Sequence, residues 1–157
     1  MARSAQSWLD EYGSSHQNPT NKLIHWICIP LIMLSLMMLL QQIEFFNLDG
    51  RSWHGAHALV IFASLYYLFL SVKLALGMLL ISMGLLALMY YLSALSLSLG
   101  MASWLLGLGI FVFAWIFQFI GHKIEGKKPS FLKDLQFLLI GPMWLLSFIY
   151  QKLGIRY

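Results

Sequence analysis

Histidine and amide side chains gather in two polar stretches of a chain that is otherwise strongly apolar. The first stretch, residues 12–25, holds His16 and His25, two of the five histidines. The second stretch, residues 118–129, holds His122. Neutral imidazole is a good ligand for zinc, iron or copper. Three histidines brought together from these stretches would therefore form a metal site.

The spacing within the two stretches predicts two polar helix faces. Each face carries polar side chains three or four positions apart: Asn18, Asn21 and His25 on the first, and Gln118, His122 and Glu125 on the second. Ionisable groups at the mouth of apolar helices are expensive to place there, so such faces indicate a functional site. We expect neighbouring carboxylate or amide groups to accept the ring N–H groups and fix the tautomers, which makes Asn18, Asn21 and Gln118 supporting residues.

Each histidine also has a purely structural explanation. His16 could be a solvated loop residue, and His25 could form a hydrogen bond at a helix interface. His122 could mark a helix end. His54 and His57 are typical of polar residues at a membrane interface.

The composition predicts an all-α integral membrane protein, with residues 1–157 forming a single membrane domain. The chain is 60% hydrophobic and 10% charged, whereas a soluble domain has about 25% charged residues. The net charge of +4 indicates contact with anionic lipid headgroups or an acidic substrate and not with nucleic acid. The polar N-terminal segment, residues 1–17, predicts that no signal peptide is cleaved.

Four apolar segments are expected to cross the bilayer as helices. They cover about residues 18–40, 56–70, 74–92 and 102–121. Asn18 and Pro19 are a favourable helix start, and residues 41–53 read as a loop. A fifth hydrophobic helix, residues 131–150, is interrupted by Gly141-Pro142, and it could span the membrane, re-enter it or lie in the interface.

Counting the crossings sorts the histidines into two groups. If the chain turns near Lys73, then His16, His25 and His122 lie on one side of the membrane. His54 and His57 lie on the other side. The first side carries most of the basic residues, which predicts that it is cytoplasmic: Arg3, Lys22, Lys73, Lys123, Lys127, Lys128 and Lys133.

The two polar stretches resemble the signatures of a known family, the 2-hydroxy fatty acid dioxygenases of fatty-acid α-oxidation. The first motif is Tyr12-x3-His16-x-Asn18-Pro19-x-Asn21-x3-His25, with Ile29-Pro30 after it. The second is Trp115-x2-Gln118-Phe119-Ile120-Gly121-His122-x2-Glu125-Gly126-x2-Pro129, and Gly141-Pro142 fits the motif beyond. The chain departs from the pattern at Ile124, where an aromatic residue is common.

The resemblance implies a membrane enzyme that depends on Fe(II) and uses O2 to shorten a 2-hydroxy fatty acid by one carbon. His16, His25 and His122 match the motif histidines, and a fourth ligand, if one is needed, would be His54 or His57. A 2-hydroxy acid could chelate iron through its hydroxyl and carboxylate groups. This implies catalytic roles for the three histidines and Glu125, with Glu125 also a possible carboxylate ligand.

Three lysines of the second stretch could steer the substrate carboxylate: Lys123, Lys127 and Lys128. The cytoplasmic face of a bacterial inner membrane or of the endoplasmic reticulum is the expected location. A small membrane transporter, with histidines that bind a metal or relay protons, is the main alternative, although charged residues are nearly absent from the middle of the apolar segments. A structural membrane protein is a third reading. The preferred chain length and the oligomeric state stay open.

Overall fold

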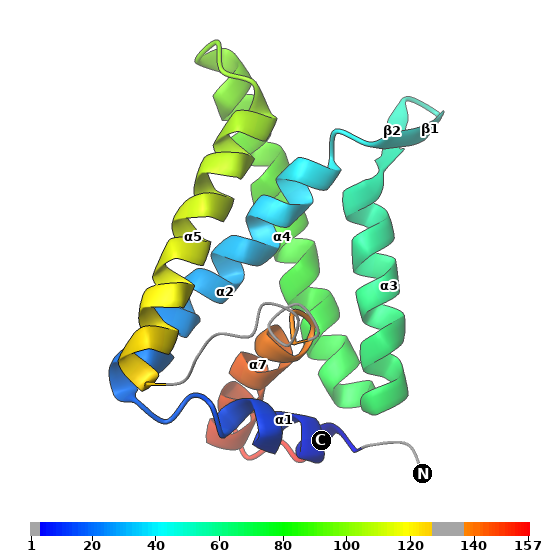
Figure 1. Ribbon diagram of the computed structural model, residues 1–157. Coiled ribbons are helices and arrows are strands. Elements are labelled where there is room, and N and C mark those ends of the chain that lie inside the picture. Colours follow the sequence, from blue (N-terminus) through cyan, green and yellow to red (C-terminus); the bar gives the residue numbers. More distant parts are fainter. Residues whose placement is uncertain (1–3, 127–136) are drawn as a thin grey trace.

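The computed structural model describes residues 4–126 and 137–157, and over these residues the fold is all-α, as expected (Figure 1). In chain order the helices are α1 (Ala5–Gly13), α2 (Pro19–Leu40), α3 (Gly55–Leu70), α4 (Val72–Ser98), α5 (Ser103–Glu125) and α7 (Ile140–Lys152). A small hairpin, β1 (Glu44–Leu48) and β2 (Arg51–His54), lies between α2 and α3.

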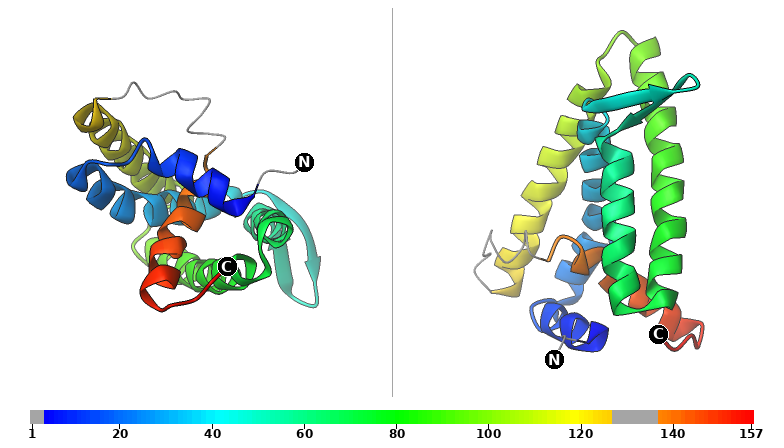
Figure 2. Two further views of the ribbon diagram at one scale, coloured as in Figure 1. Left: turned by 90° about the horizontal axis from the view of Figure 1, so that it is seen from below. Right: turned by 90° about the vertical axis from the view of Figure 1, so that its right-hand side faces the viewer.

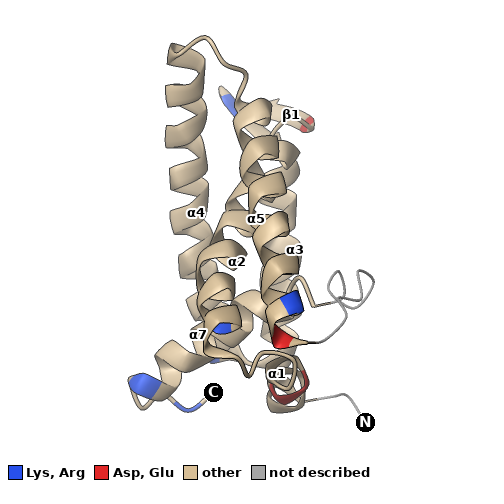
Figure 3. Cartoon of the chain, turned by 60° about the vertical axis from the view of Figure 1, so that its left-hand side comes forward, with Lys and Arg blue, Asp and Glu red and all other residues tan. Residues whose placement is uncertain are grey.

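Three of these helices are long and apolar enough to cross a membrane, namely α2, α4 and α5. The apolar helix α3 is shorter, with 16 residues. Charged residues lie near the ends of the helices, and the middle of the bundle has none among the described residues (Figure 3). An apolar middle with charged ends is what a bilayer requires, so the fold is that of a membrane protein.

The helix starts follow local sequence signals. The Asn18 side chain accepts hydrogen bonds from the backbone N–H groups of Thr20 and Asn21, at 2.9 and 3.4 Å, and caps α2. Ser71 is extended, and its hydroxyl caps α4 by accepting from the Leu74 N–H. The predicted turn before Lys73 is therefore present, and α3 and α4 run side by side in opposite directions (Figures 1 and 2).

The expected loop at residues 41–53 contains the β1–β2 hairpin. Its two turn residues, Asp49 and Gly50, have φ values of 50° and 76°. A two-residue turn with positive φ at both positions matches the twist of a hairpin, and Asp-Gly favours it. The hairpin leaves Phe46 and Trp53 exposed and stacked on each other, as suits aromatic residues at a membrane interface.

Helices α2 and α5 make the most extensive contact of the bundle. Two glycines of α5 allow it. A Cβ atom on Gly107 would lie 2.8 Å from Cβ of Met38, and one on Gly121 would collide with the Asn21 amide oxygen. The absence of side chains at these positions brings His122 of α5 close to the N-terminal turns of α2.

The last helix is short, and its N-terminal part is buried. With 13 residues, α7 is about 20 Å long, less than the roughly 30 Å of a hydrocarbon core. The Lys73 ammonium donates to the carbonyl of Arg156, and the Tyr150 hydroxyl donates to the carbonyl of Lys73 at 2.7 Å. The chain thus ends on the side where α1 lies (Figure 1).

The limits of this last helix differ from those expected. Residues 131–136 of the predicted segment lie outside the described residues, and α7 ends at Lys152. Gly141 and Pro142 do not interrupt the helix but lie in its first turn. Proline is tolerated there because the first N–H groups of a helix have no intrahelical partner.

Candidate metal centre

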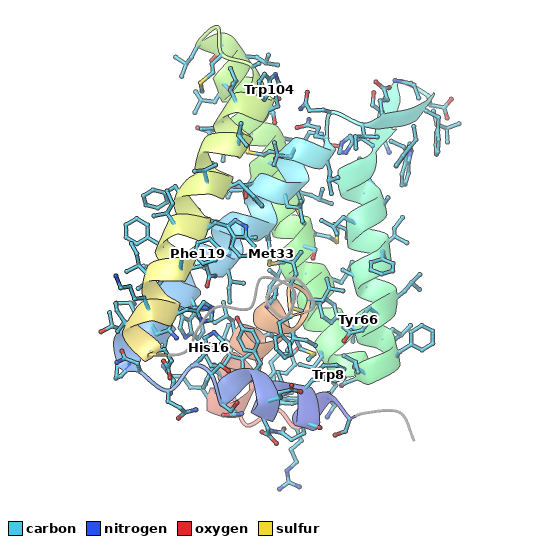
Figure 4. The ribbon with its side chains drawn as sticks, in the orientation of Figure 1. Trp8, His16, Met33, Tyr66, Trp104 and Phe119 are labelled. Carbon is cyan, nitrogen blue, oxygen red and sulfur yellow. The ribbon has the colours of Figure 1, made fainter. Side chains whose placement is uncertain are left out.

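His16, His25 and His122 meet at the end of the bundle where α1 lies. His16, labelled in Figure 4, comes from the segment between α1 and α2. His25 comes from the second turn of α2, and His122 from the last turn of α5. All three side chains are buried. One ring nitrogen of each histidine can serve as a ligand atom, and these three nitrogens lie within 4.8 Å of one another. The structure thus brings together the three histidines that the crossing count had grouped.

Backbone carbonyl groups fix the tautomers of two of these rings. His16 Nδ1 lies 2.7 Å from the carbonyl oxygen of Tyr12, and His25 Nδ1 lies 2.9 Å from that of Asn21. A carbonyl oxygen can only accept, so both Nδ1 atoms carry the hydrogen. The expectation that amide side chains hold these tautomers is wrong for His16 and His25, since carbonyl groups four residues earlier do so.

The other ring nitrogens of this pair face each other. His16 Nε2 and His25 Nε2 are 2.9 Å apart, and with hydrogen on Nδ1 each neutral ring presents a lone pair there. Two lone pairs repel unless a cation lies between them. Metal–imidazole bonds are about 2.0–2.1 Å, so two ligands at right angles around one ion lie about 3 Å apart. The donor set therefore fits a metal ion.

Glu125 is turned toward the segment that carries His16. One carboxylate oxygen accepts from the Gln17 N–H at 2.8 Å. The other accepts from the Asn18 N–H at 2.9 Å and from the Asn21 amide at 3.0 Å. In the described residues Glu125 is not part of the ligand cluster, so the expected carboxylate ligand instead ties this segment to the end of α5.

The other predicted site residues have separate positions. Asn18 caps α2, and Asn21 contacts Glu125 and Gly121. Gln118 lines a cavity beside the cluster. Lys123 is exposed and does not line that cavity, while Lys127 and Lys128 lie outside the described residues.

His54 and His57 lie at the opposite end of the bundle, beside the hairpin (Figure 1). His54 Nε2 is 2.8 Å and His57 Nε2 is 3.1 Å from the Tyr90 hydroxyl of α4. These contacts link the start of α3 to α4. The proposal that one of them supplies a fourth ligand is wrong for this fold, because the length of the helices separates them from His16.

Two aromatic side chains support His16. The Tyr12 ring stacks on the His16 ring with centroids 4.2 Å apart, and the Trp144 ring lies 5.3 Å away. Tyr12 belongs to the first motif, whereas Trp144 of α7 carried no signal in the sequence. Helices α1 and α7 thus cover one side of the cluster.

A cavity of about 50 Å³ opens beside the histidines. It lies between α2, α5 and the start of α7. Its polar wall includes Gln118, His25 and His122, and its apolar wall includes Ile29 and Ile32. The volume suits a few small polar groups and not a long acyl chain.

Comparison with known proteins assigns the chain to a family. Residues 2–153 match the family model described as 2-hydroxy-palmitic acid dioxygenase Mpo1-like. The chain is 31% identical over 153 residues to the 2-hydroxy-palmitic acid dioxygenase MPO1 of Saccharomyces cerevisiae, covering 95% of this chain and 81% of the yeast protein. No solved structure matches. The chain, with its buried histidine cluster in an apolar helical bundle, belongs to the Mpo1-like family of 2-hydroxy-palmitic acid dioxygenases.

Proposed function

We propose that this protein is an Fe(II)- and O2-dependent dioxygenase that shortens 2-hydroxy fatty acids by one carbon. The observation that carries the proposal is the buried cluster of His16, His25 and His122, whose ligand atoms lie within 4.8 Å of one another. The name of the yeast relative, a 2-hydroxy-palmitic acid dioxygenase, supports the substrate class.

In this proposal the three histidines hold the metal, and the rest of the site keeps them in place. The Tyr12 and Asn21 carbonyl groups keep the Nε2 lone pairs of His16 and His25 directed into the cluster. Glu125 positions His16 through the Gln17 and Asn18 amides. When bound, Fe(II) supplies the O2 chemistry that these side chains lack.

The cavity next to the cluster accepts the hydroxyl and carboxylate end of the acid. Its apolar residues, such as Ile29 and Ile32, exclude water from that end. The acyl chain continues into the apolar surroundings of the helices. Lys123 lies outside the cavity wall, so its part is to attract the carboxylate to this face of the membrane from a distance.

We place the site at the cytoplasmic face of the membrane, since Lys22, Lys73 and Lys123 lie at this end. In a eukaryotic cell this corresponds to the endoplasmic reticulum and in a bacterium to the inner membrane. A transporter is less well supported, because the histidines lie at the two ends of the bundle and do not follow a path through its middle.

Metal analysis combined with an activity assay tests the proposal. The purified protein should contain iron and convert 2-hydroxypalmitate, in an O2-dependent reaction, to the acid with one carbon fewer. His16→Ala, His25→Ala and His122→Ala should each lose iron and turnover while the protein stays in the membrane. His57→Ala, at the other end of the bundle, is the matched control and should keep both. Full activity in all three cluster variants would contradict the proposal.

A further inference from the structure

Gln118 places a carboxamide group in the wall of the cavity beside the histidines. The side chain is only 6% exposed, and it lines the cavity together with His25 and His122. Within residues 4–126 and 137–157, no group forms a hydrogen bond to this carboxamide. Burying an amide without a partner is destabilising, which indicates that a ligand in the cavity supplies the partner.

The position of Gln118 on α5 restricts what that ligand is. Gln118 lies four residues before His122, so the two side chains share one face of the helix. Apolar residues such as Ile32 of α2 line much of the remaining wall. A ligand that reaches the histidines therefore passes the carboxamide with its polar end.

We propose that Gln118 is the specificity-determining residue that recognises the 2-hydroxyl group of the substrate. This inference rests on the proposed function. A carboxamide has an acceptor oxygen and two N–H donors, and a 2-hydroxy acid has a hydroxyl donor next to a carboxylate acceptor. The Gln118 oxygen accepts the hydroxyl hydrogen, and its NH2 group donates to the carboxylate.

The same pairing rejects the acid without a hydroxyl group. Palmitate satisfies the NH2 group but leaves the buried amide oxygen without a donor. A site built around a hydroxyl group discriminates against the analogue that lacks it for this reason. Trp115, also in the cavity wall, cannot replace Gln118 because an indole only donates.

The test combines a change in the protein with a change in the ligand. Dissociation constants for 2-hydroxypalmitate and 2-fluoropalmitate are measured by tryptophan fluorescence on the full-length protein in lipid nanodiscs without O2. Fluorine has about the size of a hydroxyl group but cannot donate. The proteins are the wild type, Gln118→Met, which keeps the shape of the side chain, and Gln151→Met, which makes the same change at an exposed glutamine of α7.

We expect Gln118→Met to weaken binding of 2-hydroxypalmitate by about tenfold to a hundredfold, because the hydrogen bonds to its hydroxyl and carboxylate groups are both lost. Binding of 2-fluoropalmitate should weaken less, because this ligand loses only the hydrogen bond to its carboxylate, so the two changes couple. This coupling measures the contact between Gln118 and the hydroxyl group alone, because contacts of the hydroxyl group with other residues are the same in both proteins. Gln151→Met should behave as the wild type, and iron content should be equal in all three proteins.

Additive effects of the two changes would overturn the inference. Loss of the discrimination in Tyr12→Phe, but not in Gln118→Met, would overturn it as well, because the Tyr12 hydroxyl would then be the acceptor. In both cases the proposed function stands if the wild type still shortens 2-hydroxypalmitate. A wild type that neither shortens 2-hydroxypalmitate nor distinguishes it from 2-fluoropalmitate would refute both.

Discussion

The carboxylate of Glu125 connects parts of the chain that are more than a hundred residues apart. It accepts three hydrogen bonds, from the N–H groups of Gln17 and Asn18 and from the Asn21 amide. Hydrogen bonds to an ionised acceptor are about twice as strong as neutral ones. His16 lies directly before two of these donors, so Glu125 controls how firmly this histidine is held in the cluster.

Replacing Glu125 with Gln should therefore weaken metal binding without removing a ligand. The neutral amide has one acceptor oxygen in place of two. Its NH2 group can only donate, so it repels the backbone N–H group that it would face. Outer hydrogen bonds of this kind typically change metal affinity by about tenfold to a hundredfold. Competition with a chelator measures this affinity, and Glu44→Gln, at the exposed hairpin, is the control. Unchanged affinity in Glu125→Gln would show that the segment holds His16 without this contact.

His54 titrates at the opposite end of the molecule, away from the metal centre. Burial lowers the pKa of His54 below its ordinary value of 6.5, the neighbouring His57 lowers it further, and Glu44 opposes the shift. Well above pH 6.5 this residue is neutral in both the folded and the unfolded state. As the pH falls below this value, the unfolded state takes up the proton first, so stability declines.

Chemical unfolding at pH 7.5 and 5.5 measures this decline (both pH values are chosen about one unit either side of the ordinary histidine pKa). The wild type should unfold more easily at the lower pH, and His54→Gln should show a smaller difference between the two. Tyr90, which contacts the His54 ring at 2.8 Å, does not titrate in this range. An equal difference in both proteins would assign the pH dependence to other groups.

At the scale of helices, the contact between α2 and α5 sets the distance between His25 and His122. Gly107 is in the second turn of α5, where a Cβ atom would lie 2.8 Å from Cβ of Met38. Gly109, two residues later, has no atom within 4 Å of such a Cβ. Replacing each glycine with alanine therefore adds the same methyl group inside the α2–α5 contact at Gly107 and outside it at Gly109.

Gly107→Ala should destabilise the protein by about 1–3 kcal/mol, because overpacking forces the helices apart. Gly109→Ala should be neutral or slightly stabilising, since alanine favours a helix more than glycine. Thermal unfolding in detergent compares the two variants. Equal stability would mean that α2 and α5 adjust to a methyl group at no cost.

At the scale of the whole molecule, the cavity accommodates only the polar end of a fatty acid. Its volume of about 50 Å³ contrasts with the apolar helix surfaces around it, where residues such as Phe119 and Trp26 are exposed. We infer that the acyl chain lies along these surfaces, among the lipids.

Chain length should then have little effect on turnover. An enclosed tunnel discriminates by about tenfold or more per methylene group, whereas a chain among lipids makes similar contacts at every length. We expect kcat/KM for 2-hydroxy acids from myristate length upward to vary by less than about tenfold. Assays in nanodiscs at a fixed mole fraction of substrate measure this. A sharp cut-off at one length would point to an enclosed tunnel.

The sequence predicted much of this architecture, for identifiable reasons. The Asn18-Pro19 start of α2 is a local signal, and the grouping of His16, His25 and His122 follows from the number of crossings. The role of Glu125 was not predictable, because helical spacing gives the face of a residue but not the rotation of α5 against α2. The position of α7 was left open for a similar reason. Its hydrophobicity fits a buried helix and a spanning one equally well.

The small cavity at one end of an apolar bundle has a kinetic consequence. Substrate that approaches along the helix surfaces is taken from the bilayer, so the enzyme responds to the density of substrate in the plane of the membrane and not to its amount per volume of water. Adding inert lipid at constant substrate should slow the reaction, and adding buffer should not. Such surface dilution would make the lipid composition around the protein a direct determinant of its rate.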